Sequence, residues 1–334
     1  MTTYKEINGT AVQNYAGDLP GAVDGQLWYN STATNFKFQY GATAAAWSTG
    51  GSLNTARFWL TGAGTQTAAL GFGGNGSLAV TESYNGTSWT EVNDLNTGRS
   101  QLAGAGTNTA ALGFGGNAPA VTAVTETWNG TNWTEVNDLN TARYDLAGVG
   151  SNTSALAFGG ASPTIVAITE LWNGTNWTEV NDLNTARTSL GEAGVSNTSA
   201  LAFGGLNPAQ PPPSGILSVT ELWNGTNWTE VNDLNIGKRQ LGGAGIQTSA
   251  LAFGGFDDIT PALTATTESW NGTNWTETAD LNSATRAMGS TGANNTAALS
   301  FGGLNPSTTA ATEEFNTGVA VGAWSTGNSL NTGR

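Results

Sequence analysis

Carboxylates are the side chains of this chain best suited to acid–base chemistry, because its 334 residues include no histidine and no cysteine. That composition excludes Ser–His–Asp triads, thiol nucleophiles, histidine-ligated zinc and disulfide bonds. Two carboxylates could still hydrolyse a glycosidic bond, one as the acid and the other as base or nucleophile. Such a pair should be unique in the chain, and most of the acidic residues here are repeated. We therefore expect no enzyme activity, no metal site and no cofactor, with calcium binding by the repeated aspartates as the alternative for the metal.

The acidic residues form three series that recur once per repeat. The first glutamate series comprises Glu82, Glu126, Glu170, Glu221, Glu268 and Glu313, and the second comprises Glu91, Glu135, Glu179, Glu230 and Glu277. The aspartates are Asp94, Asp138, Asp182, Asp233 and Asp280. We expect the first series to pair with repeated arginines such as Arg143 and Arg187, and the aspartates to cap turns between repeats. Which glutamate meets which arginine is left open by the sequence.

These residues belong to six copies of one pattern, in which an arginine precedes a Gly/Ala stretch, a Phe-Gly-Gly triplet and a Thr-Glu-x-aromatic-Asn-Gly-Thr-x-Trp segment. The triplet phenylalanines are spaced 42 to 50 residues apart, at Phe72, Phe114, Phe158, Phe203, Phe253 and Phe301. Self-similarity at this period predicts a radial or stacked repeat architecture. The absence of a 3.6-residue apolar period excludes a helical solenoid.

One repeat reads as four short antiparallel strands. In the copy from Arg143 to Asp182, alternation within 154–158 puts large side chains on one face and alanines on the other. Asn173-Gly174 predicts a tight hairpin, with Trp172 and Trp177 as cross-strand neighbours. A four-stranded meander of about 44 residues is typical of a propeller blade, and its Gly/Ala-rich first strand suits the crowded axis. We therefore predict an all-β propeller.

The pattern resembles the kelch repeat, which has a double glycine after the second strand, an aromatic in the third and a tryptophan in the fourth. The fourth-strand tryptophans are Trp89, Trp133, Trp177, Trp228, Trp275 and Trp324. An arginine at the start of the blade is found at Arg57, Arg99, Arg143, Arg187 and Arg286, with Lys238-Arg239 at the remaining position. The resemblance covers residues 57–334 and implies a kelch-like propeller. Kelch-type copper oxidases need cysteine and histidine, which this chain lacks.

The number of blades depends on how the first 56 residues are read. Residues 45–57 nearly duplicate 323–334, and segments 26–30 and 35–40 look like strands. We predict seven blades, with residues 1–56 as a diverged first blade and 57–334 as six kelch-like repeats. The alternative is six blades with 1–56 as an N-terminal attachment segment. A closed ring is expected because an open row would expose two apolar faces and free sheet edges.

Variation between the copies is concentrated in the loop after Phe-Gly-Gly, which is long after Gly205 and Gly255. Insertions on one face of a repeat protein often mark its binding face. The candidate ligand-binding residues are Asn207, Gln210, Pro211, Pro212, Pro213, Phe256, Asp257 and Asp258. Asp257 and Asp258 are also the unrepeated carboxylates that a carbohydrate-active enzyme would use. The alternative explanation for these loops is neutral drift at the solvent surface.

The net charge of −14 comes from about −2 per repeat and is spread over the molecule. It disfavours nucleic acid and anionic membranes as partners. We see no signal peptide and no apolar run of membrane-spanning length. Residues 20–32, Pro-Gly-Ala-Val-Asp-Gly-Gln-Leu-Trp-Tyr-Asn-Ser-Thr, and the repeat style resemble phage tail-fibre and virion-appendage proteins, particularly of marine phages.

The phage resemblance implies a non-enzymatic virion structural or adhesion protein, located in the particle and made in the host cytoplasm without a signal peptide. Its partners would be other virion proteins and a host cell-surface glycan or protein. A bacterial surface or secreted adhesion propeller is the alternative function, and a carbohydrate-active enzyme is a minor one.

Overall fold

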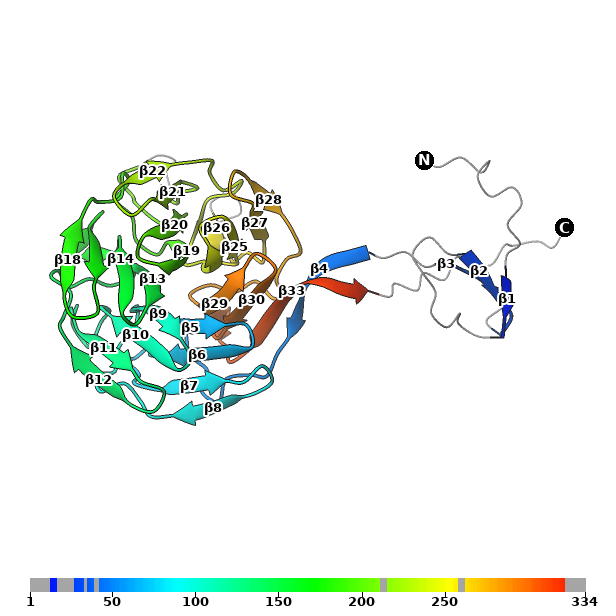
Figure 1. The fold of residues 1–334 in the computed structure, drawn as a ribbon, viewed down its shortest axis with the longest axis horizontal. Coiled ribbons are helices and arrows are strands. Elements are labelled where there is room, and N and C mark those ends of the chain that lie inside the picture. The colour runs from blue at the N-terminus through cyan, green and yellow to red at the C-terminus, as the bar shows by residue number, and fades with distance from the viewer. Residues whose placement is uncertain are drawn as a thin grey trace. The chain divides into compact units, whose positions relative to one another are not determined.

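The computed structural model describes residues 13–16, 27–32, 35–38, 42–210, 215–257 and 262–321. Within these ranges the chain is all-β, and it divides into two compact units, residues 46–316 and residues 1–45 with 317–334. No helix of the described segments is long and apolar enough to cross a membrane. The larger unit is a β-propeller of six four-stranded antiparallel blades around one axis (Figure 1).

Five blades are each built from one continuous stretch of chain. Blade 1 contains β5 (Thr61–Thr65), β6 (Ala68–Phe72), β7 (Thr81–Tyr84) and β8 (Trp89–Val92). Blade 2 contains β9 (Ala103–Thr107), β10 (Ala110–Phe114), β11 (Thr125–Trp128) and β12 (Trp133–Val136). Blade 3 contains β13 (Ala147–Ser151), β14 (Ser154–Phe158), β17 (Thr169–Trp172) and β18 (Trp177–Val180).

The next two blades follow the same order. Blade 4 contains β19 (Gly191–Ser196), β20 (Ser199–Phe203), β21 (Thr220–Trp223) and β22 (Trp228–Glu230). Blade 5 contains β24 (Gly242–Ile246), β25 (Ser249–Phe253), β27 (Thr267–Trp270) and β28 (Trp275–Glu277). Short two-stranded sheets lie in the loops of three blades: β15 (Ala161–Ser162) with β16 (Thr164–Ile165), β23 (Lys238–Arg239) with β26 (Phe256–Asp257), and β31 (Leu304–Asn305) with β32 (Ser307–Thr308).

Blade 6 closes the ring with strands from both ends of the chain. It combines β29 (Gly289–Asn294), β30 (Ala297–Phe301) and β33 (Thr312–Val321) with the N-terminal β4 (Ala42–Thr49) as its outer strand. Trp47 of β4 therefore occupies the fourth-strand position predicted for Trp324, which lies outside the described residues. Inner strand β29 lies beside β5 of blade 1, so the ring is continuous.

The prediction of seven blades is wrong, and the six-blade alternative is the one observed. Strands β2 (Leu27–Asn30) and β3 (Asn35–Phe38) do form near the predicted segments, but they join β1 (Gln13–Tyr15) in a separate three-stranded sheet. The physical reason is that the near-duplicate segment 45–57 supplies the missing outer strand of blade 6. It is thus used to complete an existing blade and does not belong to an additional one.

The packing between blades follows the predicted large and small faces of the second strand. Leu156 and Phe158 pack toward blade 4, whereas Ala155 and Ala157 face blade 2 together with Trp177. The Trp177 ring lies 4.9 Å from that of Phe114, and its Nε1 donates a hydrogen bond to Thr125 Oγ1 in blade 2 at 3.1 Å. Each tryptophan thus fills the wedge between blades where the sheets diverge.

Glycine in the inner strands has a steric cause at the axis. A Cβ on Gly104 would lie 2.8 Å from the carbonyl oxygen of Gly62 in the neighbouring blade and 2.9 Å from the Phe72 ring. The predicted cross-strand pair is confirmed, because Trp172 is the register partner of Trp177 and their rings are 5.3 Å apart. The Asn-Gly hairpin between them is confirmed as well.

Candidate functional site

A closed ring of backbone hydrogen bonds surrounds the axis at one end of the propeller. One residue from each blade takes part, and its N–H donates to the carbonyl oxygen of the equivalent residue in the preceding blade. The six bonds measure 2.8 to 3.0 Å. The ring residues are Trp59, Gln101, Asp145, Ser189, Gln240 and Ala287.

All six ring residues have a left-handed backbone conformation, with φ between 50° and 56°. This region costs a non-glycine residue about 1–2 kcal/mol, and glycine would avoid that cost. None of the six is glycine, and the six side chains comprise an indole, two amides, a carboxyl, a hydroxyl and a methyl group. A repeated backbone shape that carries different side chains is the arrangement expected of a recognition surface on a constant scaffold.

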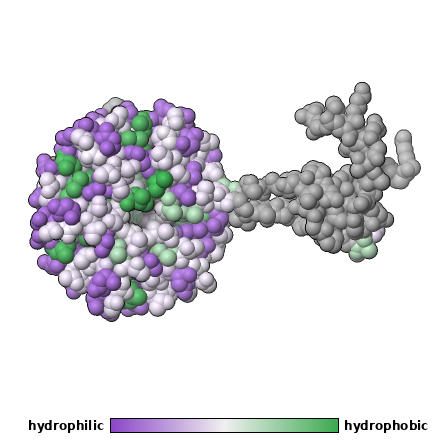
Figure 2. Space-filling view, in the orientation of Figure 1, coloured by the Kyte–Doolittle hydropathy of each residue, from purple (hydrophilic) through white to green (hydrophobic). Residues whose placement is uncertain are grey.

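The ring residues line a central pocket. Its walls include the repeated leucines that follow the ring, such as Leu102 and Leu146, and a volume of about 90 Å³ there is open to water. That space holds several water molecules. Figure 2 shows one face of the propeller, where hydrophilic residues predominate and small apolar patches surround a central depression. A concave site with apolar walls and a few converging polar groups is the usual form of a ligand site.

Asp145 is the acidic member of the ring. Burial raises its pKa to about 6, while hydrogen bonds from Gln101 and Ser189 and the charge of Arg239 oppose that rise. Ser189 Oγ donates to the Asp145 carboxylate at 3.1 Å. At neutral pH the carboxylate is mostly ionised and can accept further hydrogen bonds from a ligand.

Glu192 lies deeper on the axis, where the inner strands of the other blades carry only glycine or serine. Its equivalents by strand register are Gly62, Gly104, Gly148, Gly243 and Ser290. The residue borders the central pocket and also a second cavity on the axis, which is lined by the inner strands of all six blades. Burial raises the pKa of Glu192 to about 8, so the group is largely protonated at neutral pH. Within the described ranges it has no hydrogen-bond or ionic partner.

Two arginines stand at the rim of the pocket beside its ring residues. Arg239 and Arg286 precede Gln240 and Ala287, and both guanidinium groups lie over the ring of Phe256, at 4.9 and 5.8 Å. Arg286 Nη1 donates to Gln240 Oε1 at 2.9 Å. The pKa of Arg239 is lowered, first by burial and then by the charge of Arg286.

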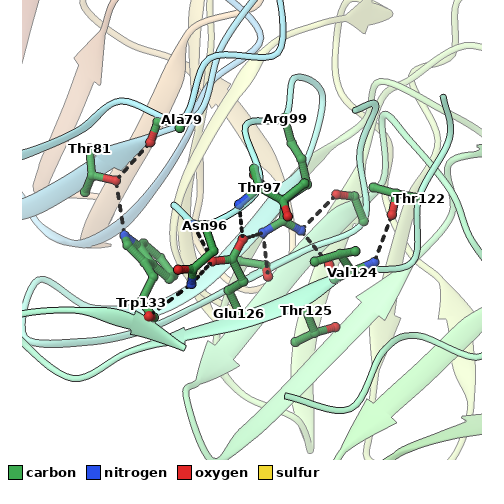
Figure 3. Close-up of polar contacts among 12 residues, drawn as sticks. Ala79, Thr81, Asn96, Thr97, Arg99, Thr122, Val124, Thr125, Glu126 and Trp133 are labelled. Carbon is green, nitrogen blue, oxygen red and sulfur yellow. Dashed lines mark hydrogen bonds and ion pairs between the residues drawn. The ribbon is translucent and has the colours of Figure 1, made fainter. Parts of the chain in front are cut away.

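The remaining cationic residues of the propeller are structural. In blade 2, Glu126 accepts hydrogen bonds from Asn96 and from the Thr97 N–H, and it forms an ion pair of 2.9 Å with Arg99 (Figure 3). The other pairs join Arg57 to Glu82, Arg143 to Glu170, Arg187 to Glu221 and Lys238 to Glu268. Each repeated glutamate thus binds the segment that leads into its own blade, which answers the pairing question left open by the sequence.

The sequence placed Arg286 in this structural series, and that assignment is wrong. The buried position in blade 6 is taken by Thr285, whose Oγ1 donates to the Ser283 carbonyl at 3.0 Å. Glu313 accepts hydrogen bonds from Asn282 and Ser283 but has no cationic partner in the described part of the chain. Arg286 is one position further along and reaches the pocket rim. The aspartate series accepts a hydrogen bond from the first N–H of the third strand, as between Thr125 and Asp138.

The predicted loop residues are not gathered at one point. Asn207 is buried; its Nδ2 donates to the Ala186 carbonyl oxygen in the segment that leads into blade 4, and its Oδ1 accepts from the Ala209 N–H in its own loop. Gln210 is exposed. Phe256 lies under the two arginines, and Asp257 is buried opposite Lys238. Pro211, Pro212, Pro213 and Asp258 lie outside the described residues. No cluster of three or more potential metal-ligating side chains is present in the described ranges.

Sequence reasoning missed the ring residues and Glu192, and it did not show that Arg239 lacks an ion-pair partner in the described part of the chain. The available signal was the second residue after each blade-opening position, which takes five different types in six copies, while the residue after it is leucine in five of them. A glutamate inside a Gly-rich inner strand was a second signal. Neither this chain nor any part of it matches a known family model, and a search of curated proteins finds no similar sequence.

Proposed function

We propose that this chain is a non-enzymatic binding protein of a virus particle, of the tail-fibre or capsid-appendage kind. It would bind a host surface structure or a neighbouring virion subunit through the face that carries the central pocket. The observation that supports binding most directly is the ring of six left-handed residues. Its backbone conformation is the same in every blade, whereas its side chains are of five different types.

The virion assignment rests on the sequence. The Phe-Gly-Gly and Asn-Gly-Thr-x-Trp repeats resemble kelch proteins, and residues 20–32 resemble short motifs of phage appendages. A six-blade ring is compatible with a kelch-like origin. The buried ion pairs and interlocked tryptophans form a rigid scaffold, which is what a particle outside the cell requires of a receptor-binding surface.

Localisation of the protein tests this proposal. Antibodies raised against the full chain should label purified virus particles from the source of the gene, and electron microscopy should show the label on fibres or appendages. Label on the envelope of bacterial cells, and none on particles, would favour the alternative of a bacterial adhesion propeller.

Binding is tested separately from localisation. Fluorescent full-length protein should bind intact host cells, and Gln101→Ala or Gln240→Ala should reduce that binding. The matched control is Asn227→Ala on an exposed hairpin of blade 4, which should bind normally. Equal binding by all variants would place the contact away from the pocket. Turnover of a saccharide that is lost in Asp145→Asn or Glu192→Gln would instead support the enzyme alternative.

A further inference from the structure

The distribution of positive charge in the propeller is uneven. Residues 46–316 hold seven lysines and arginines, and five of them are buried in ion pairs with the repeated glutamates. The two that remain, Arg239 and Arg286, lie side by side at equivalent positions of blades 5 and 6. A chain with a net charge of −14 thus places both of its unpaired propeller cations at one edge of the central pocket.

The two guanidinium groups lie near each other without a direct ion pair in the described ranges, and the opposing charge that acts on Arg239 is the Asp145 carboxylate. Both lie over the ring of Phe256, and burial and the charge of Arg286 lower the pKa of Arg239, whereas the charge of Asp145 opposes this effect. The Nε of Arg239 is buried and has no hydrogen-bond partner among the residues that the structure describes. Neither arginine forms an ion pair within the described ranges. Adjacent like charges repel, and an anion placed between two guanidinium forks removes that repulsion through charge-assisted hydrogen bonds.

The pocket beside the arginines offers a different chemistry. Gln240 connects the two regions, because it accepts a hydrogen bond from Arg286 and lines the pocket. The carboxylate of Asp145 and the hydroxyl of Ser189 also line the pocket, and the Nε1 of Trp59 is buried without a hydrogen-bond partner in the described part of the chain. Donors, acceptors and an indole together match sugar hydroxyls, which both donate and accept, and the apolar face of a sugar ring.

We propose that the central pocket binds an acidic saccharide, with its carboxylate or sulfate group between Arg239 and Arg286 and its hydroxyls on the ring residues. This inference deepens the proposed function and rests on it, because it names the class of surface structure that the propeller recognises. An acidic peptide fits less well, since its side-chain carboxylate would use the arginines but it has no hydroxyl groups to donate to the Asp145 carboxylate and pair with Ser189 and Gln240.

The experiment measures binding of the full chain to trisaccharides of glucuronate, galacturonate and sulfated galactose by titration calorimetry. Each acidic probe is paired with its carboxyl-reduced or desulfated twin. At least one acidic probe should bind about tenfold or more tightly than its neutral twin, which is the minimum expected for a charge-assisted contact. Equal affinity for both twins, or no binding of any probe, overturns the proposal.

Variants locate the contact. Arg239→Gln and Arg286→Gln should each weaken binding of the acidic probe about tenfold or more and leave the neutral twin unaffected. Arg239→Lys keeps the positive charge but loses the paired N–H donors of the guanidinium group, so a smaller loss of affinity for the acidic probe is expected. Thr229→Glu, on the exposed outer strand of blade 4, makes the same change in net charge and should bind as the parent does. Unchanged binding in both glutamine variants, or equally tight binding of a triglutamate peptide, overturns the proposal.

Intact cells separate the two proposals. If the protein binds host cells while acidic saccharides do not compete and both glutamine variants still bind, the saccharide site is wrong and the surface-binding function stands. If the acidic trisaccharide binds but neither cells nor particles are recognised, the saccharide site stands and the proposed function is wrong.

Discussion

At the scale of single residues, this propeller separates side chains that hold the scaffold from side chains that are free to vary. Glu170 accepts hydrogen bonds from Asn140 and from the Thr141 N–H, and it pairs with buried Arg143 at 3.0 Å. Burial lowers the pKa of Arg143, and the charge of Glu170 opposes that effect. The Glu170–Arg143 pair is needed for the stability of its blade, so these two positions cannot vary to give a new binding specificity.

The repeated ion pair should be costly to break, and blade 6 provides the comparison. Glu170→Gln leaves Arg143 buried without a counter-charge and should lower the free energy of unfolding by roughly 3–5 kcal/mol. Glu313→Gln removes a carboxylate that has no cationic partner in the described part of the chain, so about 1–2 kcal/mol is expected from its lost hydrogen bonds. Denaturant unfolding of the two variants checks this, and equal losses would contradict it.

Glu192 should make the stability of the protein depend on pH. Its pKa is raised from 4.5 to about 8, so the folded state keeps a proton that the unfolded state has lost. Stability should therefore fall as the pH rises from about 4.5 to 8. At pH 8.5, Glu192→Gln should be more stable than the parent by roughly 1–3 kcal/mol, since Glu192 borders cavities where solvent screens part of the effect.

The pH range of that measurement matters because Asp145 also titrates, with a pKa raised to about 6. Comparing the two proteins between pH 6.5 and 8.5 isolates Glu192. Glu179→Gln, on an exposed outer-strand position, is the control and should leave the slope of the parent unchanged. A glutamine variant at 192 that keeps the parent's slope would show that Glu192 is ionised throughout.

At the scale of strands and blades, the decisive element is β4. It supplies Trp47, whose Nε1 donates to Thr267 Oγ1 at 3.1 Å and whose ring lies 4.8 Å from Phe253 in blade 5. Asn282 also donates to the Trp47 carbonyl oxygen. The N-terminal strand thus makes the same contacts to the preceding blade that Trp177 makes in blade 3, which is why it completes blade 6.

Trp47→Ala should lower the free energy of unfolding by roughly 3–5 kcal/mol, because it leaves a cavity between blades 5 and 6 where the ring closes. Thermal or denaturant unfolding of the full chain measures this loss. Val195→Ala is the control, since Val195 is 63% exposed and its truncation should change stability by less than about 0.5 kcal/mol. A loss at Trp47 as small as that at Val195 would contradict the role of β4.

At the scale of the whole molecule, six inner strands and six ring hydrogen bonds define one axis, and every unrepeated polar group of the pocket is arranged around it. The left-handed ring conformation is retained in all six blades at an energetic cost. Because the blades contribute different side chains to equivalent positions, a symmetric scaffold presents an asymmetric site.

The cost of the ring conformation can be measured. Ala287→Gly should raise the free energy of unfolding by roughly 0.5–1 kcal/mol, because glycine adopts positive φ without strain and only a methyl group is lost. Ala250→Gly, in the buried strand β25, is the matched control and should instead lower stability by roughly 1 kcal/mol. If both substitutions destabilise equally, the ring is not strained.

Much of the scaffold could be predicted from the sequence because its causes are local and repeated. Period-2 alternation, Asn-Gly turns and paired tryptophans predict a four-stranded blade, and six copies predict a propeller. The blade count was wrong because two nearly identical segments, 45–57 and 323–334, compete for one strand position. Local sequence does not decide which copy pairs with β33.

The pocket is a property of the tertiary structure alone. Trp59, Asp145 and Gln240 are 86 and 95 residues apart in the chain and meet only because the ring closes. Arg286 was grouped with the structural arginines because it lies one residue from their position, and a shift of one residue decides whether a guanidinium enters the blade or reaches the rim. The sequence alone determined the repeated unit, since its forces act between near neighbours. Ring closure decided which unrepeated residues share a site, since that depends on contacts between distant blades.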